Sequence, residues 1–269
     1  MFLYQLFNKS LAPSSERVEV KTKLGFKLML DLNEYSQRMI YFFGNYDERH
    51  EISMLQKILL PGDTFWDIGA NIGFYTLTAS IFVGEQGTVV AFEPGPESWQ
   101  ALMTNLSLNR ITNVLPLKMA VSDECGWVTL YSQPGIADGG GSIIPPPDPS
   151  ARADICPSIT LDRFYQDQGL GPPTLLKIDV EGAEDQVLAG GLNLLSGDTP
   201  PLLLVEMNDR QAVGRLLQGL GFAGVHLQRR KWYLCQDLAA AKSRNMLWFH
   251  PDHDWHWERV KKIPIIGDK

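Results

Sequence analysis

The stretch 64-TFWDIGANIG-73 decides the fold, because an apolar run of strand length leads directly into a glycine-containing turn. The residues that follow, up to position 83, have the apolar content of a buried helix. Gly69 and Gly73 allow the chain to turn tightly and allow a ligand to approach the backbone. Asn71 lies between them, and asparagine tolerates left-handed backbone geometry better than most residues. The stretch therefore predicts a strand, a turn open to a ligand, and a helix.

The alternation of strand and helix continues along the chain. Strands are predicted at residues 64–68, 88–92, 114–117, 175–178, 201–205, 222–227 and 246–249, and helices at 72–83, 96–109, 182–195 and 209–220. Alternating elements of these lengths indicate an α/β three-layer sandwich around a mostly parallel sheet. Ligands of such sheets bind beyond the carboxyl ends of the strands, so the residues that follow each strand are the first site candidates.

The chain is predicted to have one main domain with additions at both ends. Residues 17–32 alternate in polarity as a β-hairpin does, and residues 47–60 have helical spacing that ends at a Pro-Gly pair. We therefore expect residues 1–60 to form a cap packed on a core domain at residues 61–250. A C-terminal tail, residues 251–269, follows the domain.

One segment within the domain is long and irregular. Residues 132–158 contain three consecutive glycines and several prolines. Loops of this length in a compact domain are usually functional lids or disordered segments. Because the segment lies between the third and fourth strands of the core domain, we predict that it forms a lid over the site.

Composition and charge exclude several classes of partner. The 269 residues carry a net charge of -7 and a pI near 5.3, which argues against a sequence-independent grip on nucleic acid phosphates. Three widely spaced cysteines form no metal-ligand pattern and fit a reducing compartment, so a cytoplasmic location is expected. No apolar run is long enough to span a bilayer, so no stable membrane insertion is expected. The first twenty residues lack a basic region and a cleavage site, and we interpret them as a docking helix.

Two acids indicate which cofactor the glycine turn accepts. The dinucleotide fingerprint G-x-G-x-x-G is absent, since the glycines here are spaced G-x-x-x-G and follow Asp67. A carboxylate at this place would repel a pyrophosphate, but it suits the ammonium group of S-adenosylmethionine (SAM). Glu93 follows the second strand, where a carboxylate can accept both hydroxyls of a ribose. The two acids favour SAM over a nicotinamide dinucleotide.

Polar residues also follow the fourth and fifth strands of the core. Asp179 ends the fourth strand, with Lys177 two residues earlier on the same face and Glu181 two residues later. Glu206 and Asn208 end the fifth strand. Asp179 or Glu181 could act as a general base with Lys177 holding a carboxylate or tuning its pKa, and Glu206 is a further catalytic candidate. Alternatively, Asp179, Glu206 and Asn208 could hold Mg²⁺ through oxygen ligands.

Several motifs, in this order, resemble the FkbM family of SAM-dependent methyltransferases: FWDIGANIGFYTL, AFEPGPESWQALMTNLSLN, MAVSD, ITLDRF, LLKIDVEGAEDQVLAG and PPLLLVEMN. The resemblance runs from about residue 65 to residue 222, and RNMLW at residues 244–248 is similar to the family's closing strand. It implies a class I methyltransferase fold, which is Rossmann-like and has a seven-stranded sheet with an antiparallel last strand.

The resemblance also implies roles for the residues around the predicted site. Gly69, Ala70 and Asn71 would contact the methionyl end of SAM with Asp67 nearby, Glu93 would bind the ribose, and Ala120, Ser122 and Asp123 would lie near the adenine.

The expected activity is methyl transfer from SAM to an oxygen of a small metabolite, a sugar, or a glycosylated or lipid natural product. The family resemblance leaves the acceptor and the oligomeric state open. Two alternatives remain at this point. A nicotinamide-dependent oxidoreductase would use the same sheet but would need a phosphate-binding loop. A non-catalytic SAM-binding protein would not need the polar cluster around Asp179 and Glu206.

Overall fold

The computed structural model of the protein describes residues 17–43, 49–132, 141–148, 150–228, 231–235, 237–239, 241 and 243–266. The docking helix predicted for the first twenty residues falls almost entirely outside the described residues. Within the described part of the chain, no helix combines the length and the apolar character needed to cross a bilayer.

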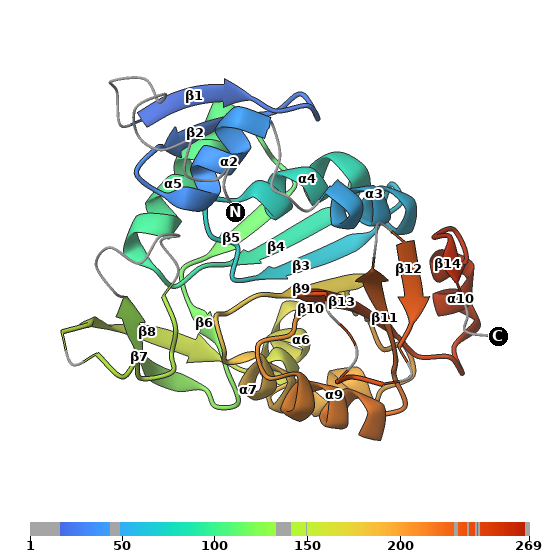
Figure 1. Ribbon diagram of the computed structural model, residues 1–269. Helices are drawn as coiled ribbons and strands as arrows, with labels where there is room; N and C mark the ends of the chain where they lie inside the picture. Colours follow the sequence, from blue (N-terminus) through green and yellow to red (C-terminus); the bar gives the residue numbers. More distant parts are fainter. Residues whose placement is uncertain are drawn as a thin grey trace.

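A central β-sheet crosses the molecule (Figure 1). Its described strands, in spatial order, are β14 (Ile265–Ile266), β12 (Lys231–Leu234), β11 (Ala223–Gln228), β13 (Asn245–Phe249), β10 (Leu202–Glu206), β9 (Leu175–Ile178), β3 (Thr64–Ile68), β4 (Thr88–Phe92) and β5 (Val114–Leu117). Strands β10, β9, β3, β4 and β5 are parallel, whereas β13 runs antiparallel between β10 and β11. The predicted seven-stranded sheet with an antiparallel last strand is therefore present. Its β11 edge is extended by β12, which forms a hairpin with β11, and by the short β14.

The strands are apolar on both sides because helices cover both faces of the sheet (Figure 1). One face is covered by α3 (Arg49–Ile58), α4 (Phe74–Val83) and α5 (Pro96–Leu108), and the other by α6 (Leu161–Gln168), α7 (Glu184–Ala189), α8 (Leu192–Leu195) and α9 (Arg210–Gly219). The sheet has one hydrophobic core on each face, and successive residues of a strand point into opposite cores. Phe65 packs with the first group of helices, while its neighbour Trp66 packs with the second. This arrangement is the predicted three-layer sandwich.

The N-terminal cap forms as a hairpin followed by helices. Strands β1 (Arg17–Lys21) and β2 (Lys27–Asp31) pair antiparallel, and α2 (Tyr35–Phe43) follows them. The hairpin is attached to α5, because the backbone N–H of Met29 donates to Asn105 Oδ1 at 2.7 Å. The Asn105 amide donates in turn to the carbonyl of Ile72, at 2.8 Å. The cap thus contacts the turn that follows β3.

The segment predicted as a lid is partly a strand. A second, three-stranded sheet contains β6 (Ala120–Val121), β8 (Arg152–Ile159) and β7 (Gly126–Ser132), in that order. Strand β8 therefore takes up the last part of the 132–158 segment, pairing with all of β7. Residues 133–140 and 149 lie outside the described residues, and residues 141–148 are described between these two gaps.

Two predicted helices have different bounds for steric reasons. Helix α4 begins at Phe74, later than predicted, because Gly73 before it has a left-handed backbone with φ of 89°. The helix predicted at residues 182–195 is two short helices, α7 and α8, separated by Gly190 and Gly191. A Cβ atom at Gly190 would overlap the carbonyl oxygen of Ser122, so the break places the chain against the second sheet.

The C-terminal tail is a folded element that packs on the core. It contains α10 (Asp254–Val260), whose Arg259 forms an ion pair with Asp63, with Nη2 and Oδ1 2.9 Å apart. The buried ring of His256 accepts a hydrogen bond from the backbone N–H of His250 at Nδ1, and its Nε2 lies 2.9 Å from the carbonyl oxygen of Pro200. Both ring nitrogens of His256 are engaged, so this histidine fastens the tail to the domain.

Candidate active site

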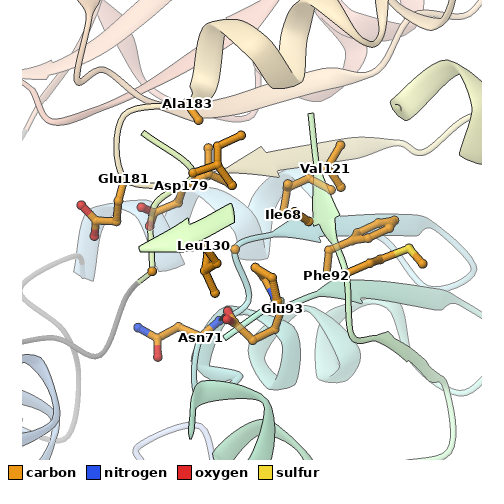
Figure 2. Close-up of a pocket in the computed structure, with 16 residues that line it drawn as sticks. Ile68, Asn71, Phe92, Glu93, Val121, Leu130, Asp179, Glu181 and Ala183 are labelled. Carbon is orange, nitrogen blue, oxygen red and sulfur yellow. Dashed lines mark hydrogen bonds between the residues drawn. The ribbon is translucent and has the colours of Figure 1, made fainter. Parts of the chain in front are cut away.

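A pocket opens at the carboxyl ends of the central strands, and Figure 2 shows its lining. It encloses about 660 Å³ including its open mouth. Its walls come from the ends of β3, β4 and β9 and from the small sheet. The lining residues are Ile68, Gly69, Asn71, Phe92, Glu93, Pro94, Met119, Ala120, Val121, Leu130, Gly141, Ile143, Asp179, Val180, Glu181 and Ala183. The place is the one that Brändén's rule predicts for an open α/β sheet.

The turn after β3 forms one wall of this pocket. Gly69 and Ala70 donate their backbone N–H groups to the carbonyl of Phe92, at 3.0 and 2.9 Å. Gly69 has φ of 85°, and a Cβ atom there would overlap the carbonyl oxygen of Asp179. Asn71 has φ of 50°, the left-handed geometry anticipated from its residue type. The turn is therefore held close to both β4 and β9, and only glycine fits at position 69.

Glu93 joins this turn to the loop after β4. The backbone N–H of Asn71 donates to Glu93 Oε2 at 2.7 Å, and that of Gly95 donates to Oε1 at 2.8 Å. Burial raises the pKa of Glu93 to about 7, although the two backbone hydrogen bonds oppose the rise. Glu93 thus has two roles in the structure: it lines the pocket, and it fixes the two loops that form the pocket floor.

Lys177 lies between two carboxylates. Asp67 and Lys177 are directly opposed partners on β3 and β9 and face α4. The Lys177 ammonium lies 2.9 Å from Asp179 Oδ2, 3.9 Å from Asp67 Oδ1 and 4.5 Å from the centre of the Tyr75 ring. Burial raises the pKa of Asp67, whose Oδ2 accepts a 2.6 Å hydrogen bond from Thr76. The predicted common face of Lys177 and Asp179 is present, and the single ammonium is shared between the two acids.

Asp179, Glu181 and Glu206 form a cluster of carboxylates at the ends of β9 and β10, with oxygen atoms within 4.8 Å of one another. Burial alone would raise the pKa of Asp179, but Lys177 and a hydrogen bond with Glu206 hold it below its ordinary value. Burial, followed by the charge of Asp179, raises the pKa of Glu206 to about 9. The two pKa values shift in opposite directions, so Asp179 is the member of the pair that favours the ionised form and Glu206 the one that favours the protonated form.

Arg244 lies beside this cluster and forms ion pairs with two of its acids. Its position could not be anticipated from local sequence spacing. Its Nε contacts Glu206 Oε1, and its Nη2 lies 3.9 Å from Glu181 Oε2. The Arg244 side chain is 66% exposed, so the cluster has a largely solvent-exposed cation beside it. Arg244 precedes β13, and it reaches the acids because antiparallel β13 pairs with β10.

Asn208 differs from its predicted role as a cation ligand. Its amide nitrogen donates to Glu206 Oε2 at 2.8 Å and to Glu184 Oε1 at 3.0 Å. The amide oxygen is therefore not the group directed at the acids. The third oxygen ligand offered by the geometry is Glu181, which was predicted as a base candidate.

The residues predicted near the adenine separate into two groups. Ala120 lines the pocket. Ser122 is buried beyond it, where its hydroxyl donates to Asp123 Oδ1 at 2.9 Å, and neither residue is part of the pocket wall. Leu130 and Ile143 were not predicted, although both line the pocket. Leu130 could have been found from the alternating polarity of β7, in which Leu130 is an apolar residue of the inward face. That face of β7 covers the pocket.

The chain is similar in sequence to known methyltransferases. The model of the methyltransferase FkbM domain matches residues 67–227, which is more than half of the chain. The 31-O-demethyl-FK506 methyltransferase FkbM of Streptomyces tacrolimicus is 31% identical over 206 residues, covering 62% of this chain and 75% of that protein. The hexuronic acid methyltransferase AglP of Haloferax volcanii is 28% identical over 148 residues, covering 55% of this chain. The matched part of the chain spans 58% of the length of AglP.

Among solved structures, the methyltransferase FkbM from Methylobacillus flagellatus KT aligns with a TM-score of 0.46 and 16% identity, over 91% of this chain and 57% of that one. The family match over residues 67–227 includes the glycine turn, Glu93 and the acid cluster. It confirms the resemblance found in the sequence motifs and decides against the nicotinamide-dependent alternative. The chain belongs to the FkbM family of methyltransferase domains.

Proposed function

We propose that this chain transfers a methyl group from SAM to an oxygen of a small metabolite, a sugar, or a glycosylated or lipid natural product. The observation that carries the proposal is that Glu93 and Asp179 line one pocket, at the ends of β4 and β9. A carboxylate suited to ribose hydroxyls and a carboxylate suited to proton transfer therefore open onto the same space.

The residues that line the pocket fit SAM. Glu93 uses one lone pair of each oxygen for a backbone N–H, which leaves further lone pairs for the ribose hydroxyls. Gly69 and Asn71 would hold the methionyl end, and the apolar side chains of Phe92 and Val121 would hold the adenine beside Ala120. SAM, when bound, supplies a methyl group attached to a positively charged sulfur. An oxygen nucleophile can attack that methyl carbon, and the sulfur then leaves as S-adenosylhomocysteine.

Asp179 is the proposed proton acceptor for the acceptor hydroxyl. It is the ionised member of its pair with Glu206 and it lines the pocket. Lys177 fixes its orientation through the 2.9 Å ion pair. Because the remaining requirement is to hold the acceptor in line and exclude water, the walls contributed by Leu130 and Ile143 support the same role.

The names of the relatives guide the choice of acceptor. One is named for a hexuronic acid and the other for a demethylated hydroxyl position of FK506. We propose an oxygen of a sugar or of another small natural product, rather than a nucleic acid, as the acceptor of this chain. We place the reaction in the cytoplasm, because the three cysteines are free and suit a reducing compartment.

In a second version of this proposal, the carboxylate cluster binds a divalent cation such as Mg²⁺ that assists the same methyl transfer. The observation in its favour is the convergence of Asp179, Glu181 and Glu206, since such ions prefer carboxylate oxygens. Arg244 competes with it, because its guanidinium already contacts Glu206. A dependence of turnover on Mg²⁺ would require Arg244 to move away from the cluster.

The test combines binding and turnover. Calorimetry with S-adenosylhomocysteine should show binding, and labelled SAM should transfer methyl groups to a panel of uronic acids, glycosides and macrolide alcohols, with and without chelator. The variant Asp179→Asn should bind S-adenosylhomocysteine as the wild type does but lose turnover. No binding of S-adenosylhomocysteine would refute the proposal. Binding without transfer to any acceptor of the panel would favour the non-catalytic alternative.

A further inference from the structure

We propose that Ser142 is a positioning residue that holds Glu181 beside Asp179, and so links the roof of the cofactor pocket to the acid cluster. The roof segment is defined here as residues 141–144, which follow β7 in the chain. Where it concerns turnover, the inference rests on the proposed function.

Glu181 has a backbone conformation that needs support from outside its own turn. Its φ is 53°, and the following Gly182 has φ of 103°. For a residue with a side chain, left-handed backbone of this kind costs roughly 1 to 2 kcal/mol. Among the described non-glycine residues, Asn71 and Arg110 share it, and Asn71 lines the same pocket. Strained residues of this kind persist where surrounding contacts hold them, and they concentrate at functional sites.

Ser142 provides such a contact from 39 positions away in the sequence. Its hydroxyl donates a 2.8 Å hydrogen bond to the carbonyl oxygen of Glu181. The same hydroxyl accepts from the backbone N–H of Ile144, at 3.1 Å, which fixes the direction of the O–H group. The hydroxyl is thus committed to the turn that carries Glu181.

The roof segment is itself seated on the pocket. The backbone of Ser142 exchanges two hydrogen bonds with Tyr131 of β7, at 2.8 and 3.0 Å. Gly141 passes so close to Leu130 that a Cβ atom there would lie 2.7 Å from its side chain. Gly141, Ile143 and Leu130 all line the pocket. A ligand in this pocket therefore meets the segment whose serine holds Glu181.

The bond to the main chain of Glu181 leaves its side chain directed at the acid cluster. Glu181 Oε2 lies 3.9 Å from Arg244 Nη2, and its carboxylate is within 4.8 Å of those of Asp179 and Glu206. Figure 2 shows Glu181 and Asp179 side by side at one end of the pocket. Releasing the carbonyl would let the turn relax, and the carboxylate would leave this position.

The first experiment is hydrogen exchange on the full chain, with no need for an acceptor. The Gly182 N–H donates to Glu184 Oε1 at 3.0 Å, so its exchange reports on the turn. In Ser142→Ala, exchange across residues 180–184 should be about 3- to 10-fold faster, the equivalent of one lost hydrogen bond. Ser142→Thr keeps a hydroxyl and should restore protection. Ser150→Ala is the matched control, because the Ser150 hydroxyl bonds Asp148 on the same connection, away from the pocket.

The second experiment is a double-mutant cycle on methyl transfer. Ser142→Ala should lower kcat about 3- to 10-fold while the Kd for S-adenosylhomocysteine changes less than about twofold. In a Glu181→Gln background the same substitution should have no further effect on kcat, because the group it positions is gone.

Unchanged exchange in Ser142→Ala would overturn the proposal, as would an equal loss of kcat in both backgrounds. A loss confined to S-adenosylhomocysteine affinity would also overturn it, since Ser142 would then only shape the cofactor pocket. If the wild type transfers no methyl group to any acceptor, the proposed function fails, and the exchange experiment alone decides on Ser142.

Discussion

Lys177 and Asp179 form a 2.9 Å ion pair at the end of β9, in which the lysine is almost fully buried and the aspartate faces the pocket. A buried ammonium is stable only if it is compensated, and here Asp67 and Asp179 share it. The same contact holds the pKa of Asp179 below its ordinary value. The pair therefore connects the stability of the sheet with the ionisation of the proposed base.

We predict that Lys177→Met raises the pKa of Asp179 and shifts the acid limb of the kcat profile to higher pH. Removing one member of a buried charge cluster should also lower the free energy of unfolding by about 3 kcal/mol. Urea unfolding and the pH dependence of methyl transfer measure the two effects. Lys118→Met, at an exposed lysine after β5, is the control and should change neither. An unshifted acid limb in a folded Lys177→Met protein would exclude Asp179 as the titrating base.

The pKa of Glu93, raised to about 7 by burial, predicts a pH-dependent cofactor affinity. Ribose hydroxyls bond best to the ionised carboxylate, so binding should favour deprotonation. Affinity for S-adenosylhomocysteine should then rise about tenfold between roughly pH 6 and pH 8, with release of a proton. Calorimetry in two buffers of different ionisation enthalpy measures that proton. Glu93→Gln should bind weakly with no such dependence, whereas a wild type with pH-independent affinity would contradict the assignment of Glu93 to the ribose.

Much of the fold could be predicted because its signals are local. Strands β3, β4, β5 and β9 have the predicted bounds, since each is a short apolar run closed by turn residues. The shared face of Lys177 and Asp179 follows from the period of two in a strand, and it is confirmed. The left-handed turn at Asn71 follows from its residue type.

The parts that could not be predicted depend on contacts between distant segments. Arg244 reaches Glu206 because β13 pairs with β10, and nothing in the residues around Arg244 specifies that pairing. The break at Gly190 depends on the approach of Ser122 from the second sheet. Ser142 contacts Glu181 through the seating of the roof segment on β7, whose register is likewise set by tertiary packing.

Substitution of Gly69 and of Gly25 separates two costs of adding a side chain. One is backbone strain at positive φ, and the other is steric overlap of the new Cβ atom with a neighbouring atom. Both have positive φ, 85° and 97°, but a Cβ atom at Gly25 meets nothing within 4 Å, whereas one at Gly69 overlaps Asp179. Gly25→Ala should therefore lower the free energy of unfolding only by the strain, about 1 kcal/mol. Gly69→Ala should lower it by about 3 kcal/mol or more, because β3 and β9 must separate. Equal losses in the two variants, measured by urea unfolding, would show that Gly69 is not packed against Asp179.

The lowered pKa of buried His256 predicts that the folded chain loses stability in mild acid. Burial lowers its pKa from the ordinary 6.5 to about 4 in the folded chain. Above the ordinary pKa the ring is neutral in both states, so its contribution is fully present there. As the pH falls below 6.5, the unfolded chain takes up a proton that the folded chain does not. By about pH 5 this difference should lower the free energy of unfolding by about 2 kcal/mol.

His256→Gln tests this prediction, because glutamine can accept from the His250 N–H and donate to Pro200 without titrating in this range. Urea unfolding of both proteins at neutral pH and at about pH 5 should show a smaller acid loss in the variant, by about 2 kcal/mol. The other titrating groups are common to both proteins and cancel in the comparison. The same acid loss in wild type and variant would show that the folded chain accommodates a charged ring, and that the tail is not fastened by neutral His256.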